Sequence, residues 1–330
     1  MAKNYVERKD KEPWTDSATF KKFWLRRFFR IAPLYYVLLI VAIGFGNYFG
    51  EAREIIGHFY SETQTNSSRY SDASFLNVFT HVTFLFGFLP SFSFNTVLPD
   101  WSIGLEMQFY FLFPFIMLAV MRLGFAGACF AVILLCAAAK YLFPSYFAAF
   151  PMPSMILIKL HLFVAGMFIA EAIRRKSMWY VIFALVSAFG SMYMPNDVNK
   201  YHLLAQIGMI LMMATILWPR NQDSTWTNLL RLPRWILTNK FSVYMGDVSY
   251  SVYLLHLLIV LPVVAFLLSN TQFAGLPSVV RFIAAAAIIL PLTYGIASLL
   301  YKFIEKPGIK LGKSVISRSE AKNRGSVVTD

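Results

Sequence analysis

GDVSYSVYLLHLLIVLPVVAFLL, residues 246 to 268, carries no lysine, arginine or glutamate, and its single aspartate is the second residue. A helix of this length crosses the hydrocarbon layer of a bilayer, which takes about 20 residues. The whole chain has the same character, because 58% of its 330 residues are hydrophobic and only 14% are charged. A water-soluble surface does not accommodate so many apolar side chains. The sequence therefore predicts an all-α, polytopic transmembrane helix bundle.

Apolar runs of this kind recur along the chain. Those predicted to cross the membrane lie near residues 31–49, 100–121, 125–143, 154–173, 179–194, 201–218, 246–268 and 279–304. A ninth run, 74–92, is interrupted by Asn77, His81 and Thr83 and ends near Pro90. We interpret it as a re-entrant or partial helix, which is tolerated where protein covers its main chain or a cavity adjoins it.

The distribution of basic residues supports this count of about eight crossings. With 74–92 not crossing, one side of the membrane receives 24 of the 30 lysines and arginines, in segments 1–30, 122, 174–176, 219–245 and 302–324. Because cytoplasmic loops are enriched in Lys and Arg, both termini are predicted to be cytoplasmic. A crossing at 74–92 would move the later basic clusters to the opposite side.

We expect three parts along the chain: a polar cytoplasmic N-terminus at 1–20, a membrane domain at 21–313, and a disordered cytoplasmic tail at 314–330. The net charge of +13 resides in loops between apolar runs, so it indicates membrane orientation and not nucleic-acid binding. We expect an integral protein of a bacterial inner (plasma) membrane, with membrane lipid as its solvent.

Basic and aromatic side chains gather in RRFFRIAPLYY, residues 26 to 36. Arg27 and Arg30 are three residues apart and therefore share one helical face at the cytoplasmic entrance. Two guanidinium groups are suited to grip phosphate oxygens, which makes this pair a candidate phosphate site. The alternative is that they are only topology signals.

A carboxylate lies within the run LPDWSIGLEMQFYFLFP, residues 98 to 114. Glu106 follows Trp101 and Ser102 by about one and a half helical turns. A charged side chain within the hydrocarbon costs roughly 2.5–3.5 kcal/mol, so Glu106 must face the bundle interior. It is a candidate for proton transfer, and the alternative is a structural anchor between helices.

His256 ends a stripe formed by Ser249, Tyr253 and His256, spaced four and then three residues apart in SYSVYLLH. Imidazole is the usual general base near neutral pH. The alternative is a core histidine that donates to a main-chain carbonyl. The other histidines show no metal-ligand spacing, so neither a metal nor a permanently bound cofactor is expected.

Glu305 lies between two lysines in YKFIEKP, residues 301 to 307, where the last apolar run ends. It is a further candidate for proton transfer, with a surface cluster of snorkelling side chains as the alternative. Pro307 is expected to stop the helix.

These four segments, in this order, resemble the signature stretches of the acyltransferase-three family, integral membrane enzymes that O-acylate cell-envelope sugars, lipids and antibiotics. RRFFRIAPLYY is similar to the family's RxxR helix entrance, and PDWSIGLEMQFYFLFP to its WSL-x-x-E-x-QFY-x-x-P helix. SYSVYLLH resembles its SYSLYLLH, and FIEKP its terminal FIEKP. Together the matching segments cover residues 26 to 307.

The resemblance implies a reaction and its partners. An acyl-CoA, acetyl-CoA in our interpretation, enters from the cytoplasm with its phosphates on Arg27 and Arg30. Trp101 and Ser102 complete this donor site. The acyl group passes to a hydroxyl of a carbohydrate or lipid of the cell envelope, with Glu106, His256 and Glu305 as candidate catalytic residues.

The family pattern also contains two helices before the RxxR segment, and these carry the histidine that the family is thought to use in catalysis. Neither is recognisable here. We therefore expect the chain alone to be weakly active or silent unless a partner segment supplies them. An inactive or accessory membrane protein derived from such an enzyme stays open, as does a membrane transporter, which also uses intramembrane carboxylates and interrupted helices.

Overall fold

The computed structural model describes residues 12–189, 200–218 and 230–327. These residues are mostly helical, and no strand occurs among them. Five of their helices are long and apolar enough to cross a membrane, and two apolar helices are shorter. Helices suit hydrocarbon because they satisfy their main-chain hydrogen bonds internally. The prediction of an all-α polytopic bundle is confirmed.

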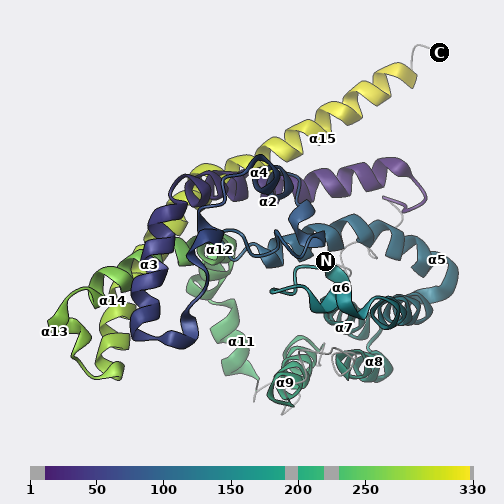
Figure 1. Cartoon of the computed structure of the whole chain (residues 1–330). Helices are drawn as coiled ribbons and strands as arrows, with labels where there is room; N and C mark the ends of the chain where they lie inside the picture. The colour runs from purple at the N-terminus through teal and green to yellow at the C-terminus, as the bar shows by residue number, and fades with distance from the viewer. Residues whose placement is uncertain (1–11, 190–199, 219–229, 328–330) are drawn as a thin grey trace. The chain divides into compact units, whose positions relative to one another are not determined.

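The chain divides into two compact units, and the divisions fall within α2, within α5 and within α12. Unit 1 comprises residues 1–21 and 104–243. Its helices are α5 (Trp101–Leu142, from Gly104 on), α6 (Pro144–Ala148), α7 (Ile156–Arg175), α8 (Met178–Ala188), α9 (Lys200–Leu217) and α11 (Arg231–Thr238). Helices α7, α8 and α9 pack against one another (Figure 1). Of the expected N-terminus at 1–20, residues 1–11 lie outside the described residues.

Two predicted runs, 100–121 and 125–143, are joined in the 42 residues of α5. The chain changes direction at Gly124, where φ is +72° and ψ is 167° (Figure 1). Glycine adopts this conformation at little cost because it has no Cβ. A further connection holds α5 to the start of α7: the Gln108 amide donates to the Ser154 carbonyl and accepts from the Ile156 N–H, both at 2.9 Å.

Unit 2 comprises residues 22–103 and 244–330. Its helical elements are α2 (Ser17–Gly44, from Lys22 on), α3 (Gly46–Phe59), η1 (Ser61–Thr63), η2 (Ser67–Tyr70), α4 (Phe75–Val82), η3 (Leu85–Phe88), α12 (Lys240–Leu268, from Tyr244 on), α13 (Thr271–Ala274), α14 (Ser278–Leu300), η5 (Tyr301–Glu305) and α15 (Lys306–Val327). Tyr250 of α12 donates its hydroxyl hydrogen to the Ile31 carbonyl of α2 at 2.8 Å, which ties these two helices together.

The run 74–92 contains only the eight residues of α4 and the short turn η3, followed by irregular chain. A helix of eight residues is about 12 Å long and does not cross about 30 Å of hydrocarbon. This agrees with the interpretation of 74–92 as a partial helix. Phe84 links α4 to η3 in a left-handed conformation, with φ of +59°.

The last helix differs from the expectation. Pro307 does not stop it, because the helix continues from α14 through the wider π-helical turn η5 into α15, and this turn stands directly before Pro307. Residues 314–327, expected to be disordered, continue α15. This helix runs beside α2 (Figure 1). Lys22 of α2 pairs with Glu320 of α15 at 2.7 Å. The two helices also approach closely at Gly308 and Gly312, which lie against Pro33 and Phe29.

Candidate functional site

Two hydroxyl groups from distant parts of the sequence meet in unit 2, where α5 begins beside α12. The Ser102 hydroxyl donates to the Tyr253 hydroxyl at 2.8 Å, and the Tyr253 hydroxyl donates to the Pro99 carbonyl at 3.0 Å. Both side chains are partly exposed. Each hydroxyl hydrogen is already donated within the protein, so either group donates to a ligand only after its hydroxyl rotates.

His256 lies one turn after Tyr253 on α12, with their ring centroids 5.8 Å apart. Its Nδ1 is hydrogen-bonded to the main-chain carbonyl of Tyr253. Because a carbonyl oxygen only accepts, Nδ1 carries the hydrogen in the neutral ring and Nε2 carries the lone pair. Nδ1 therefore makes the carbonyl hydrogen bond of the predicted alternative. Nε2 keeps its lone pair and can accept a proton, and the ring is partly exposed.

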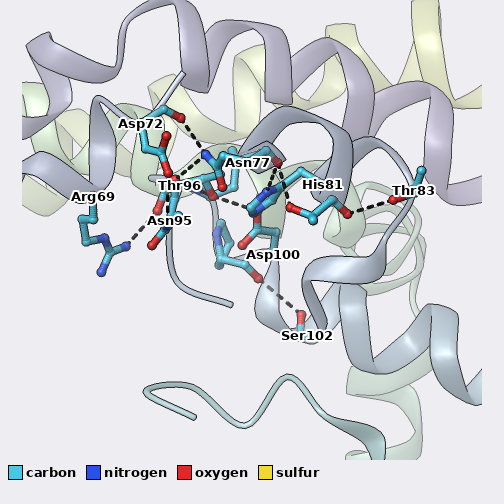
Figure 2. A network of polar contacts seen from close by, with 12 residues as sticks. Arg69, Asp72, Asn77, His81, Thr83, Asn95, Thr96, Asp100 and Ser102 are labelled. Atoms are coloured by element: carbon cyan, nitrogen blue, oxygen red, sulfur yellow. Dashed lines mark hydrogen bonds and ion pairs between the residues drawn. The ribbon is translucent and has the colours of Figure 1, made fainter. Parts of the chain in front are cut away.

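A buried acid and base lie close together near this hydroxyl pair: Asp100, two residues before Ser102 in the chain, and His81. The Nε2 atom of His81 on α4 is 3.5 Å from Oδ2 of Asp100, and both side chains are buried (Figure 2). Asp100 Oδ2 also accepts from the Thr96 hydroxyl at 2.7 Å, and His81 Nδ1 donates to the Asn77 carbonyl at 2.8 Å. Burial raises the pKa of the Asp100 carboxyl above its usual range, and the nearby His81 imidazole opposes that rise.

The irregular chain between α4 and α5 is held by polar contacts on either side of this pair (Figure 2). Arg69 donates from Nη2 to the Thr96 carbonyl at 2.8 Å, and its guanidinium lies 3.1 Å from the centroid of the Phe94 ring. The Asn95 amide donates to Asp72 Oδ2 at 3.2 Å. These contacts fix the segment that ends at Trp101, and so they position Ser102.

The structure brings two of the predicted residues together at another place in unit 2. Glu305 is buried, accepts a hydrogen bond from the Ser251 hydroxyl at 2.9 Å, and lies within electrostatic range of Arg30. Burial rules out the alternative of a snorkelling surface cluster for Glu305. Arg30 itself is exposed, and Arg27 is partly exposed with its guanidinium 5.7 Å from the Phe23 ring centroid.

The predicted residues of α5 fall on both sides of a unit boundary. Trp101 and Ser102 belong to unit 2, and Trp101 is partly exposed at the first position of the helix. Glu106 belongs to unit 1, where it accepts a hydrogen bond from the Tyr110 hydroxyl. Because Tyr110 lies one turn further along the same helix, this contact does not join two helices, and Glu106 stays a candidate for either role.

The sequence pattern does not indicate His81 and Asp100. His81 shows no metal-ligand spacing, and Asp100 stands beside Trp101 at the start of an apolar run. The available signal was the residue types themselves, since a histidine inside an apolar run and an aspartate at the start of a membrane helix are both costly unless paired. Their pairing follows from the irregular fold of residues 83–100, which no periodic pattern reveals.

The four predicted motifs lie on α2, α5, α12 and the stretch from η5 into α15. A family model described as an acyltransferase domain matches residues 13–301. The chain belongs to the acyltransferase-three family. This confirms the resemblance drawn from the four motifs.

Among curated members with sequence similarity is peptidoglycan O-acetyltransferase OatA of Listeria monocytogenes serovar 1/2a, which is 28% identical over 327 residues. The match covers 90% of this chain and 47% of that relative, so the chain spans about half the length of the acyltransferase it resembles. No solved structure matches.

Proposed function

We propose that this acyltransferase-family protein moves an acyl group, acetyl in the simplest case, from acyl-CoA to a hydroxyl of a cell-envelope carbohydrate or lipid. The observation that carries the proposal is the group formed by His256, Tyr253 and Ser102, in which a base and two donors lie on neighbouring, partly exposed side chains. The similarity to a peptidoglycan O-acetyltransferase supports an envelope acceptor and an acetyl group.

The proposed reaction assigns each group a role. The acceptor oxygen attacks the thioester carbonyl carbon while its proton passes to His256 Nε2. Ser102 and Tyr253 stabilise the negative charge that develops on the carbonyl oxygen, as donors of an oxyanion hole do. The carbon–sulfur bond then breaks, the CoA thiolate takes the proton from His256, and an ester and free CoA are released.

The donor is proposed to be held by its phosphates at Arg27 and Arg30, which lie in the interior of α2 because this helix begins ten residues earlier, at Ser17. Arg27 and Arg30 lie one turn apart on that helix and are at least partly exposed, so both guanidinium groups are accessible to a nucleotide phosphate. Arginine is suited to this role because its planar fork binds phosphate oxygens in pairs. The proximity of Glu305 to Arg30 gives this carboxylate a positioning role.

The test is transfer of labelled acetyl from acetyl-CoA to envelope material, in membranes of cells that express the chain, so that any partner segment is present. Removal of a general base typically costs a factor of about 100 to 10,000 in rate, and His256→Gln should lose activity in that range. His58→Gln changes an exposed histidine of α3 and serves as the matched control. Equal activity of His256→Gln and the parent would exclude His256 as the base.

A second variant separates the donor role from the base role. Tyr253→Phe removes one hydroxyl while keeping the ring, and it should lower the rate less than His256→Gln does. Loss of an oxyanion-hole donor typically costs a factor of about 100 to 1,000. Full activity in Tyr253→Phe would show that this hydroxyl does not contact the reacting carbonyl.

A further inference from the structure

Unit 1 contains a short helix, α11, whose apolar side is not covered by protein. Its sequence is RLPRWILT, and none of its eight residues is buried. Four of them are large apolar side chains that are between 48% and 64% exposed: Leu232, Trp235, Ile236 and Leu237. At 3.6 residues per turn, Arg231, Arg234 and Thr238 gather on the other side of the helix. The helix is therefore amphipathic, and its apolar side needs a partner that excludes water.

The attachment of α11 indicates the depth at which it lies. Arg234 donates from Nε to the Ile216 carbonyl at 3.0 Å and from Nη2 to the Trp218 carbonyl at 3.1 Å, at the C-terminal end of the apolar helix α9. Carbonyls at a helix end lack partners within the helix, so this arginine joins α11 to that end. At Lys240, two residues after the end of α11, α12 begins, and α12 is long and apolar enough to cross a membrane. The end of a spanning helix lies at the membrane surface, and α11 is placed there with it.

The charge around α11 is positive only. Residues 230–246 contain two arginines and one lysine, and neither aspartate nor glutamate. Arg231 and Lys240 are exposed, and within the described part of the chain neither forms an ion pair. An apolar side bordered by exposed cations is typical of helices that lie in the head-group layer of an anionic membrane. Phe241, 69% exposed in the first turn of α12, extends the apolar surface.

We propose that α11 is an interfacial helix that binds the anionic lipid surface of the membrane. Leu232, Trp235 and Ile236 lie below the head groups, and Arg231 and Lys240 contact lipid phosphates. Burial of the apolar side chains supplies attraction to any bilayer, and the two cations select anionic lipid. Trp235 stands beside the polar side of the helix, at the position where an indole ring reaches the head-group depth.

This surface is separate from the proposed acyl transfer. Ser102, Tyr253 and His256 belong to unit 2, whereas α11 belongs to unit 1. The proposal therefore holds whether or not the transfer reaction is correct. It agrees with the predicted orientation of the chain, because residues 219–245 are expected on the cytoplasmic side and the cytoplasmic leaflet carries the anionic lipids.

The first experiment measures the orientation of α11 in liposomes that contain the purified chain. A nitroxide label is attached through Ile236→Cys or through Thr238→Cys, which lie on opposite sides of the helix and are both exposed. Collisions of the label with oxygen, which concentrates in lipid, are compared with collisions with a water-soluble nickel complex. The label at 236 should favour oxygen, and the label at 238 should favour nickel. The parent chain, whose Cys129 and Cys136 are buried, gives the background signal.

The second experiment measures which lipid surrounds Trp235. Liposomes contain phosphatidylglycerol and phosphatidylcholine in equal amounts, and only one of the two carries bromine, which quenches tryptophan fluorescence. Because the chain has seven tryptophans, the signal of Trp235 is the difference between each chain and its Trp235→Phe counterpart. Brominated phosphatidylglycerol should quench Trp235 at least about twofold more than brominated phosphatidylcholine, since each basic residue near the surface attracts anionic lipid.

Charge variants make this result specific. Arg231→Gln combined with Lys240→Gln should abolish the preference for phosphatidylglycerol while the label at 236 still favours oxygen. Lys176→Gln changes an exposed lysine just after α7 and should leave the preference unchanged. All three positions are exposed, so these variants remove no buried contact.

Three outcomes would overturn the proposal. A label at 236 that favours the nickel complex would place the apolar side in water. Few collisions with either reagent at 236 would show that protein, such as a second copy of the chain, covers this side. Equal quenching by the two brominated lipids, or a preference that survives in the Arg231 and Lys240 double variant, would exclude these cations as the groups that select anionic lipid.

Discussion

Two individual side chains of α2 carry the donor half of the proposed reaction. Arg27→Ala combined with Arg30→Ala should weaken acetyl-CoA binding to the purified chain by about tenfold or more, because charged hydrogen bonds contribute about 1.5–3 kcal/mol each. Isothermal titration or a competition assay measures this affinity. Lys310→Ala combined with Lys313→Ala removes two exposed charges from α15 of the same unit and is the matched control. Unchanged affinity in the arginine double variant would reduce the pair to topology signals.

The pair of His81 and Asp100 makes a prediction about stability at the same scale. Asp100 accepts the hydrogen of the buried Thr96 hydroxyl and lies beside His81, so Asp100→Ala leaves a buried donor without its acceptor, which typically costs about 1–3 kcal/mol. Asp100→Ala should therefore lower the free energy of unfolding by about that amount in a denaturant titration in detergent. Asp72→Ala changes a partly exposed aspartate before α4 and should cost only about 0.5 kcal/mol. Similar losses in the two variants would show that the pair contributes no more than a surface contact.

At the scale of elements, close contact between α15 and α2 depends on two glycines. A Cβ at Gly312 would lie 2.6 Å from Phe29 Cβ, and one at Gly308 would lie 2.8 Å from Pro33 Cγ and 3.1 Å from the Phe29 carbonyl oxygen. Gly312→Ala should therefore destabilise the protein by about 1–3 kcal/mol, the usual cost of overpacking. Gly295→Ala, with nothing within 4 Å of the added Cβ, should be neutral or stabilising. Thermal unfolding in detergent distinguishes the two, and equal midpoints would contradict this packing.

The elements also show how far the sequence predicts the fold. The apolar runs predict the long helices well, because in hydrocarbon an uncharged run has few alternatives to a helix. The pattern does not predict the passage through Pro307, because the wider turn η5 that precedes this proline leaves no mark in the apolar pattern. It also misses the pairing of His81 with Asp100, which depends on irregular chain between them. Of the candidate site, the sequence indicated Ser102, Tyr253 and His256 through the motifs, while the structure added the buried pair behind Ser102.

For the whole molecule, the number of crossings is open to a direct test. The described part of α8 has eleven residues, about 16 Å of helix, whereas α9 has eighteen, about 27 Å. If both cross, reporter fusions after residues 122, 176 and 315 report cytoplasm, and fusions near 62, 148 and 197 report the other side. The charge distribution favours this pattern. A fusion near 197 that reports cytoplasm would show that α8 and α9 do not cross. Fusions after 176 and 315 that report the outside would show that the run 74–92 crosses the membrane.

The central claim is that an acyl group leaves acyl-CoA and reaches an envelope hydroxyl. Its most direct test is to give acetyl-labelled acetyl-CoA to membranes containing the chain, recover the envelope material, and expose it to mild alkali. Our proposal predicts label in that material, release of the label as acetate because the bond is an ester, and loss of both signals in His256→Gln. Label that resists alkali, or envelope material without label while acetyl-CoA remains intact, would contradict it.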